Sequence, residues 1–274
     1  MSDLVEPSEP LSKRLILDGI APSKRDSLTK LSIEHCLDST NSALQRLPLS
    51  QQHGAVILAE QQTSGRGRHG RQWHSPFGNN LYLSLGWSFA RPLSELGCLP
   101  LVVALSVARA LTRAGLRDHL IKWPNDILLN GRKLCGCLVE MRAETAATCH
   151  AVLGVGINVH MSVSEADGEI DQPWTDLHSR LPECSRNSLA ALLLEELIDH
   201  LSLFSEQGFP PLRKYWQQMD GLEGQTIEVF AGDRKHRGIA KGIDGSGALL
   251  LDTGEEVLSL HSAEVSLNKT ITGL

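Results

Sequence analysis

Apolar positions along this chain fall into short runs of strand length and a few longer segments of helix length. Asn130-Gly131 lies between two apolar runs and predicts a tight hairpin. We interpret the combination of strands and helices as an α+β domain. Five further runs of β-type composition predict the strands of a sheet, at residues 31–36, 54–60, 79–89, 120–123 and 150–161.

Three segments predict helices. Residues 38–41 (DSTN) are good N-cap residues and predict a helix after the first strand. Residues 99–115 are apolar on most faces, which predicts a buried helix. Residues 187–208 carry an apolar stripe, and we expect Asn187 or Ser188 to cap this third helix.

The carboxyl-terminal part of the chain has a different pattern. Residues 225–267 hold short alternating runs separated by glycine-containing turns, which predicts a small β-barrel. We therefore expect an extension without a two-helix pattern over residues 1–30, a main domain over 31–220 and a barrel domain over 221–274. The polar segment 162–186, interrupted by proline and glycine, predicts a mobile loop.

Composition limits the functions that such a fold can serve. The chain of 274 residues has 26 Lys and Arg against 32 Asp and Glu, a formal net charge of −6. Proteins that cover nucleic-acid phosphates are usually basic, so the positive charge here serves a local purpose. The sequence shows no signal peptide and no apolar run of about 18 residues, so we expect a cytoplasmic protein without a membrane partner.

The six cysteines form no C-x-x-C pair, and we expect reduced thiols that mostly serve as small core residues. Cys135-Gly136-Cys137 resembles a metal-binding spacing. No further His or Cys stands at ligand spacing nearby, so we expect no protein-bound metal.

One loop concentrates the positive charge. Residues 65–71 read GRGRHGR and lie between two predicted strands. Guanidinium groups held this closely repel one another unless an anion lies among them, and glycines let backbone N–H groups approach that anion. The loop therefore predicts a site for an anion with several oxygens, such as a phosphate; the alternative is a basic surface turn.

Common nucleotide-binding motifs do not account for this loop. Gly65-x-Gly67-x-x-Gly70 matches the dinucleotide fingerprint, but Pro76 and Gly78 prevent the helix that must follow. The sequence contains no P-loop motif. An RNA-binding tail of RGG type would be repetitive and disordered, whereas this motif occurs once.

Other polar or glycine positions accompany the loop. Lys122 leaves a predicted strand just before Trp123-Pro124 and suits a carboxylate or phosphate, although a plain lysine beside a turn is the alternative. Gln62 offers both a donor and an acceptor. Gly154 and Gly156 would let backbone or a ligand approach a strand closely.

Taken in chain order, these motifs resemble those of the biotin–protein ligases, in particular the biotin–[acetyl-CoA-carboxylase] ligases. The resemblance implies a class II synthetase-like mixed sheet with packed helices and a C-terminal SH3-like barrel. Lipoate–protein ligases share the catalytic fold and are the nearest alternative. The motifs are DSTN (38–41), the glycine-arginine loop with its flanks (59–85), KWPNDILLNGRKLCGCLVE (122–140) and GVGINV (154–159).

The resemblance implies a reaction in two steps. The biotin carboxylate attacks the α-phosphate of ATP and gives biotinyl-5′-adenylate and pyrophosphate. A lysine of the biotin carboxyl carrier protein of acetyl-CoA carboxylase then attacks that mixed anhydride. Mg²⁺ would accompany the triphosphate, held mainly by ATP and water. The enzyme needs no nucleophile of its own, so catalysis would depend on positioning and charge stabilisation.

The resemblance also implies roles for individual residues. Lys122, Arg66 and Arg68 are the expected catalytic residues, and the glycine-arginine loop would cover the adenylate as a lid. The expected biotin-binding residues are Ser39, Thr40, Asn41, Gln62, Gly65, Arg66, Arg68, Lys122, Gly136 and Cys137. The expected ATP- or adenylate-binding residues are Arg68, Arg71, Trp73, Lys122, Asn125, Asn158 and Trp174, the last closing over the adenine.

Expected partners follow from the same resemblance: the carrier protein, and a homodimer formed through a sheet edge as a further option. Bifunctional members of the family carry an amino-terminal winged helix-turn-helix. About thirty residues precede the first predicted strand here, too few for such a DNA-reading domain, so we expect no operon repression. Outside the family, the alternatives are a non-catalytic binding module and a nucleic-acid-binding protein that uses the GRGRHGR loop.

Overall fold

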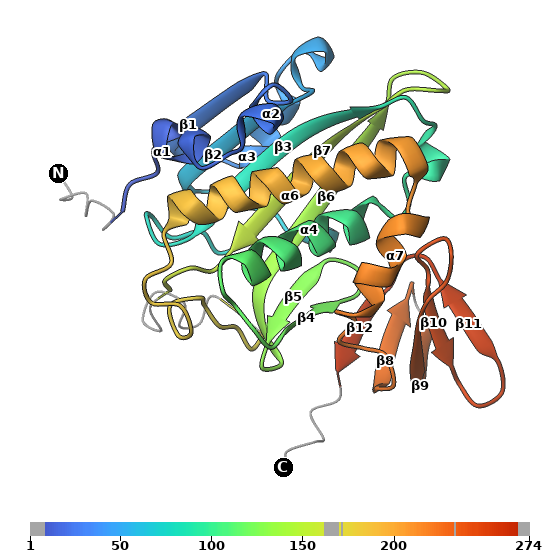
Figure 1. Ribbon diagram of the computed structural model, residues 1–274. Coiled ribbons are helices and arrows are strands. Elements are labelled where there is room, and N and C mark those ends of the chain that lie inside the picture. The colour runs from blue at the N-terminus through green and yellow to red at the C-terminus, as the bar shows by residue number, and fades with distance from the viewer. Residues whose placement is uncertain (1–8, 162–169, 171, 233, 268–274) are drawn as a thin grey trace.

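A seven-stranded mixed sheet forms the centre of the protein in a computed structural model that describes residues 9–161, 170, 172–232 and 234–267 (Figure 1). Residues 162–169 and 171, part of the segment predicted to be a mobile loop, lie outside the described residues. Strands β1 and β2 are parallel, and the other neighbouring pairs are antiparallel. Across the sheet the strands are β1 (Lys30–Leu37), β2 (Ala55–Gln62), β3 (Leu81–Phe89), β7 (Cys149–Ile157), β6 (Arg132–Ala143), β5 (Asp126–Leu129) and β4 (His119–Lys122).

The turn between β5 and β6 confirms the predicted hairpin. Asn130 and Gly131 both adopt left-handed backbone conformations, with φ of 51° and 71°. Asparagine and glycine tolerate this conformation best, and two such residues in succession match the right-handed twist of the paired strands. Helix α3 (Thr40–Gln45) begins after Ser39, as the DSTN motif predicts. The Ser39 hydroxyl accepts a hydrogen bond from the Ser42 amide.

Two long helices lie across one face of the sheet, α4 (Leu99–Arg113) and α6 (Arg186–Gln207) (Figure 1). Both present apolar residues to the main core, as expected. The predicted cap of α6 is wrong. Ser185 is extended, with ψ of 128°, and its hydroxyl accepts from the Ser188 amide, so the helix begins before Asn187. The described helices include none that is long and apolar enough to cross a membrane.

The amino-terminal segment contains two short helices, α1 (Lys13–Asp18) and α2 (Pro22–Arg25), so the prediction of no two-helix pattern is wrong. Their six and four residues are too few to show an amphipathic period in the sequence. Ile16 and Ile20 are fully buried in the main core, and α1 packs against α6. This segment is therefore part of the packed structure.

A buried ion pair connects α6 to the sheet. Arg186 donates to Glu60 Oε2 at 2.7 Å and to the Asn80 carbonyl at 3.1 Å. Glu60 and Asn80 stand on either side of the segment that carries the glycine-arginine loop. Arg186 therefore fixes both ends of that segment from behind the sheet.

A smaller antiparallel sheet follows α7 (Pro210–Gln217), which confirms an α+β fold with a separate all-β unit at the carboxyl end (Figure 1). A separate antiparallel unit of this kind is consistent with the predicted SH3-like fold. Across this sheet the strands are β11 (Val257–Leu260), β10 (Leu249–Asp252), β9 (Arg234–Ile243), β8 (Thr226–Ala231) and β12 (Glu264–Leu267).

Side chains of the larger unit donate hydrogen bonds to backbone carbonyls of the smaller one. Buried backbone carbonyls need hydrogen-bond partners, and these bonds join the two units in a polar seam. The four bonds run from Trp123 Nε1 to Gly247 O (3.0 Å), from Cys98 Sγ to Ser246 O (2.7 Å), from Arg213 to Ile243 O (2.9 Å) and from Arg68 to Ala263 O (3.3 Å).

Candidate active site

A cavity of about 670 Å³ lies between the open face of the mixed sheet, the glycine-arginine loop and the smaller unit. Ligand-binding cavities typically measure about 300–1,000 Å³. Gly65, Asn158 and Trp174 do not line it. Twelve of the expected binding residues do: Ser39, Thr40, Asn41, Gln62, Arg66, Arg68, Arg71, Trp73, Lys122, Asn125, Gly136 and Cys137.

One end of the cavity is a connected set of amide and hydroxyl groups. Gln62 Oε1 accepts from the Thr40 backbone at 2.9 Å, and Gln62 Nε2 donates to Ser75 Oγ at 3.1 Å. Ser84 Oγ lies 2.7 Å from Thr40 Oγ1 and 2.6 Å from Asn41 Oδ1. Ser39 lines the cavity at the start of α3 and caps that helix. The network fixes several donors and acceptors in place for a polar ring.

Glycines let two side chains lie directly on the sheet, so Gly154 and Gly156 do allow a close approach, although side chains make it rather than the predicted backbone or ligand. A Cβ atom on Gly154 would lie 2.3 Å from Asn41 Oδ1, and one on Gly156 would lie 2.6 Å from the Trp73 ring. A Cβ on Gly136 would lie 3.0 Å from the same ring. The indole of Trp73 therefore lies across β6 and β7 and forms a flat apolar surface inside the cavity.

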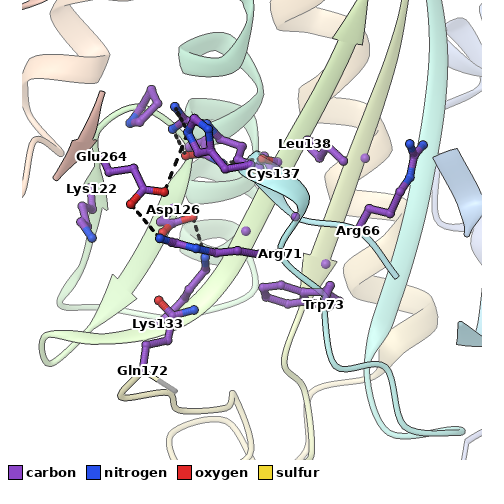
Figure 2. Close-up of a pocket in the computed structure, with 18 of the residues that line it drawn as sticks. Arg66, Arg71, Trp73, Lys122, Asp126, Lys133, Cys137, Leu138, Gln172 and Glu264 are labelled. Carbon is purple, nitrogen blue, oxygen red and sulfur yellow. Dashed lines mark hydrogen bonds and ion pairs between the residues drawn. The ribbon is translucent and has the colours of Figure 1, made fainter. Parts of the chain in front are cut away.

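The three arginines of the loop all line the cavity, but two of them already pair with carboxylates of the protein. Arg66 pairs with Glu140 at 2.8 Å, and Arg71 pairs with Glu264 at 2.7 Å. Figure 2 shows Arg66 well apart from Arg71. Carboxylates from β6 and from β12 thus relieve the repulsion that the sequence alone left unexplained.

Arg68 differs from its two neighbours. It donates to Asn125 Oδ1 at 3.2 Å and to the Ala263 carbonyl at 3.3 Å, and none of the described carboxylates forms an ion pair with it. Burial lowers the pKa of this guanidinium from its ordinary value, although Asp126 and Glu264 oppose the shift. An arginine still remains charged at neutral pH. Arg68 is therefore a partly desolvated cation available to an anion.

Lys122 is a second such cation, at the end of β4. Within the described part of the chain, its ammonium group has neither a hydrogen bond nor an ion pair. Burial lowers the pKa of Lys122 below its ordinary value, Asp126 opposes this effect, and Lys133 and Arg71 add to it. A desolvated ammonium without a partner is costly, and a bound carboxylate or phosphate would supply the missing interaction.

Asn125 fixes the strand that borders the cavity. Its side chain donates to the Cys137 carbonyl at 2.6 Å, and its own carbonyl accepts from the Cys137 amide at 3.0 Å.

All six cysteines are free, and Cys98, Cys135, Cys137 and Cys149 are buried, which confirms that most are core residues. The described residues contain no group of three or more His, Cys, Asp or Glu that could hold a metal ion.

Sequence reasoning missed three charged residues of the cavity, Asp126, Lys133 and Glu264. Lys133 Nζ lies 2.9 Å from Asp126 Oδ1 and 5.5 Å above the Trp73 ring (Figure 2). Two basic residues, Arg132 and Lys133, follow the Asn130-Gly131 turn, and this pair was a usable signal for Lys133. Glu264 had none, because it belongs to the smaller unit and meets Arg71 only in the folded chain.

The three expected residues outside the lining support neighbouring segments. The Trp73 amide donates to the Gly65 carbonyl at 2.9 Å, and a Cβ on Gly65 would lie 2.6 Å from the Trp73 carbonyl. Asn158 donates from its side chain to the Thr175 carbonyl at 3.0 Å. Trp174 forms a parallel β-bridge with Lys133. Any contact of these residues with a ligand remains a prediction.

Comparison with known protein families agrees with this fold and site. The model of the "Biotin/lipoate A/B protein ligase family" matches residues 34–158, and that of the "Biotin protein ligase C terminal domain" matches residues 224–268. The chain belongs to the biotin protein ligase family.

Individual relatives support the same assignment. The chain is 38% identical over 232 residues to the bifunctional ligase/repressor BirA of Escherichia coli, covering 84% of this chain and 72% of that protein. It is 33% identical over 228 residues to a biotin–[acetyl-CoA-carboxylase] ligase of Paracoccus denitrificans, covering 78% and 90%. The biotin protein ligase from Aquifex aeolicus in complex with biotin and ATP superimposes with a TM-score of 0.73 at 27% identity, covering 87% of this chain and 98% of that one.

Proposed function

We propose that this protein is a biotin–protein ligase that activates biotin with ATP and transfers it to a lysine of a carrier protein. The observation that carries the proposal is the pair of desolvated cations, Lys122 and Arg68, in a cavity whose other end is a fixed hydrogen-bonding network. A molecule with a polar ring at one end and a carboxylate at the other fits both. Biotin has these two ends, and the relatives bear biotin in their names.

The first step brings two anions together, the biotin carboxylate and the α-phosphate of ATP. Lys122 and Arg68 reduce the repulsion between them, and both lie in a partly dry site where charge interactions are strong. The carboxylate oxygen attacks phosphorus, and pyrophosphate leaves with the bonding electrons. Arg71 would bind phosphate oxygens with the N–H groups that its pair with Glu264 leaves free, and Trp73 would offer its ring to the nucleotide.

The biotin ring would lie against Thr40, Asn41 and Gln62, because its ureido group needs both donors and acceptors. Arg66 would close this end together with Glu140. Asn125 fixes the Cys137 peptide that borders the ring. Three other expected residues would act indirectly, by fixing the segments that border the cavity: Gly65, Asn158 and Trp174.

Mg²⁺ would enter with ATP as part of the substrate. The carboxylates nearest the nucleotide, Asp126 and Glu264, already pair with Lys133 and Arg71. Triphosphate oxygens and water therefore supply most ligands of the ion in this proposal, which suits the reluctance of Mg²⁺ to lose its water.

The carrier protein would be the biotin carboxyl carrier protein of acetyl-CoA carboxylase, as the names of two relatives indicate. We retain residues 31–220 as the catalytic domain and residues 221–274 as the barrel domain in this proposal. A homodimer, a cytoplasmic location and the lack of DNA binding stay predictions.

Biotin-dependent exchange of pyrophosphate into ATP tests the first step. The purified protein should exchange in the presence of biotin and Mg²⁺, but not with lipoate or octanoate. Exchange with lipoate or octanoate alone would keep the fold and change the substrate. Biotin binding without exchange would identify a binding module and refute the mechanism.

A further inference from the structure

A second, smaller cavity lies beside the first. Its volume is about 200 Å³, below the roughly 300–1,000 Å³ of ordinary ligand sites. We call it the side cavity. Three exposed residues, Gly97, His261 and Ser262, line its outer end, and buried residues, including Trp123, line its inner end. The side cavity therefore leads from the surface inward, between the two units of the protein.

The inner end of the side cavity adjoins the main cavity. The guanidinium of Arg68, bonded to Asn125 and to the Ala263 carbonyl, stands where the two spaces meet. Lys122, three positions before Asn125, lines the main cavity close to this point. Six residues line both spaces: Arg68, Trp123, Pro124, Asn125, Cys137 and Leu138.

The second step of the proposed reaction needs an approach of this kind. Once biotinyl-adenylate fills the main cavity, a nucleophile must reach its acyl carbon from a side that the ligand does not cover. Lys122 and Arg68 mark the position of that carbon, because they bind the carboxylate and phosphate that flank it. The side cavity ends beside Arg68, at the position where the anhydride forms.

The shape and lining of the side cavity suit a lysine side chain. Pro100, Leu101, Leu138 and Val139 provide apolar surface for four methylene groups, and a volume of about 200 Å³ accommodates one unbranched side chain. The positive charge of Arg68 at the inner end disfavours an ammonium ion. An amine that arrives there tends to lose its proton, and the neutral amine is the form that attacks.

We propose that the side cavity is the passage through which the acceptor lysine of the carrier protein reaches the adenylate, with Arg68 at its inner end. This inference rests on the proposed ligase function. The amine nitrogen forms a bond to the acyl carbon, and the bond from that carbon to the phosphate oxygen breaks. AMP leaves with the electron pair, and the amide nitrogen releases its extra proton to water. The rim residues Gly97 and Ser262 lie where the carrier protein docks.

Two rim variants test the passage. A Cβ on Gly97 would meet no heavy atom within 4 Å, and this glycine has an ordinary backbone, so Gly97→Trp fills space without strain. Ser262→Trp fills the same passage from the smaller unit. Gly245→Trp is the matched control, because Gly245 is equally open and lines neither cavity.

Each variant is measured in three assays: biotin-dependent pyrophosphate exchange, capture of the adenylate by hydroxylamine as biotin hydroxamate, and transfer of biotin to a purified carrier domain. We expect both rim variants to exchange and to form hydroxamate as the parent does. Their kcat/KM for transfer should fall about 100-fold, since a misplaced nucleophile loses that much rate. Gly245→Trp should transfer normally.

Transfer at the parental rate by both rim variants would overturn the passage. Loss of exchange together with transfer would also count against it, because the substitutions would then act on the main cavity. Failure of the parent protein to exchange at all would instead refute the proposed function, and the inference with it. The exchange assay separates these two failures.

Discussion

Gly154 and Gly156 allow the two ends of the cavity to be disturbed separately. They stand two positions apart on β7, and each is covered by a different side chain. Gly154→Ala pushes its methyl group into Asn41, at the end proposed for the biotin ring. Gly156→Ala pushes its methyl group into Trp73, at the end proposed for the nucleotide. We therefore expect Gly154→Ala to weaken biotin binding and Gly156→Ala to weaken ATP binding.

The size of the effect follows from the overlaps. The new Cβ atoms would lie 2.3 Å from Asn41 Oδ1 and 2.6 Å from the Trp73 ring. Contacts between carbon atoms are optimal at about 3.5–4.0 Å, so either side chain must move by about 1 Å. A Cβ atom on Gly136 would also lie only 3.0 Å from the Trp73 ring, so the ring has little room to move on that side. Overpacking of this kind costs about 1–3 kcal/mol, or about 5- to 150-fold in affinity.

Calorimetry without ATP measures the affinity for biotin at the first end of the cavity. The KM for ATP in pyrophosphate exchange at saturating biotin measures the effect at the nucleotide end. Melting temperatures of both variants show how much of the cost falls on folding. The reasoning is refuted if Gly156→Ala weakens biotin binding while its KM for ATP stays unchanged. Equal losses at both ends in both variants would refute it as well.

Three further predictions concern single side chains. Adenylate formation should decline as the pH rises through the lowered pKa of Lys122, since the charged form acts; Lys122→Arg should move this decline to higher pH in the exchange assay. An unchanged profile would assign the decline to another group. Arg68→Gly should release adenylate that gel filtration no longer finds with the protein, whereas retention as in the parent contradicts a covering loop. Arg186→Met should lower the free energy of unfolding in urea by about 3–5 kcal/mol, because Glu60 stays buried without its cation; a loss below about 1 kcal/mol contradicts this.

Local chemistry made much of the fold predictable. The Asn130-Gly131 turn, the cap at Ser39 and the apolar helix over α4 each depend on a few adjacent residues, and the structure confirms all three. The helices α1 and α2 escaped prediction because six and four residues cannot show a helical period. Their place is decided by burial of Ile16 and Ile20, which the sequence nearby does not reveal.

The candidate site was harder to predict than the fold, because its charged residues pair with residues far away in the sequence. The GRGRHGR loop predicted an anion site, but Arg66 finds Glu140 across 74 positions and Arg71 finds Glu264 across 193. Arg68 could not be separated from its neighbours by sequence, since the difference lies in burial and in the carbonyl of Ala263. Residues inside the longer motifs, such as Lys122, were easier to place because their strand and turn are local.

The polar seam between the two units has a consequence for how this protein can vary. All four acceptors in the seam, including Gly247 O and Ala263 O, are main-chain atoms. Main-chain carbonyls persist whatever side chain stands at the position, so these four bonds can survive divergence in the sequence of the small sheet. Chimaeras that exchange this unit between relatives should therefore assemble and keep the position of Arg68. Differences in biotin transfer among such chimaeras would then reflect the rim residues of the side cavity that each exchanged unit carries.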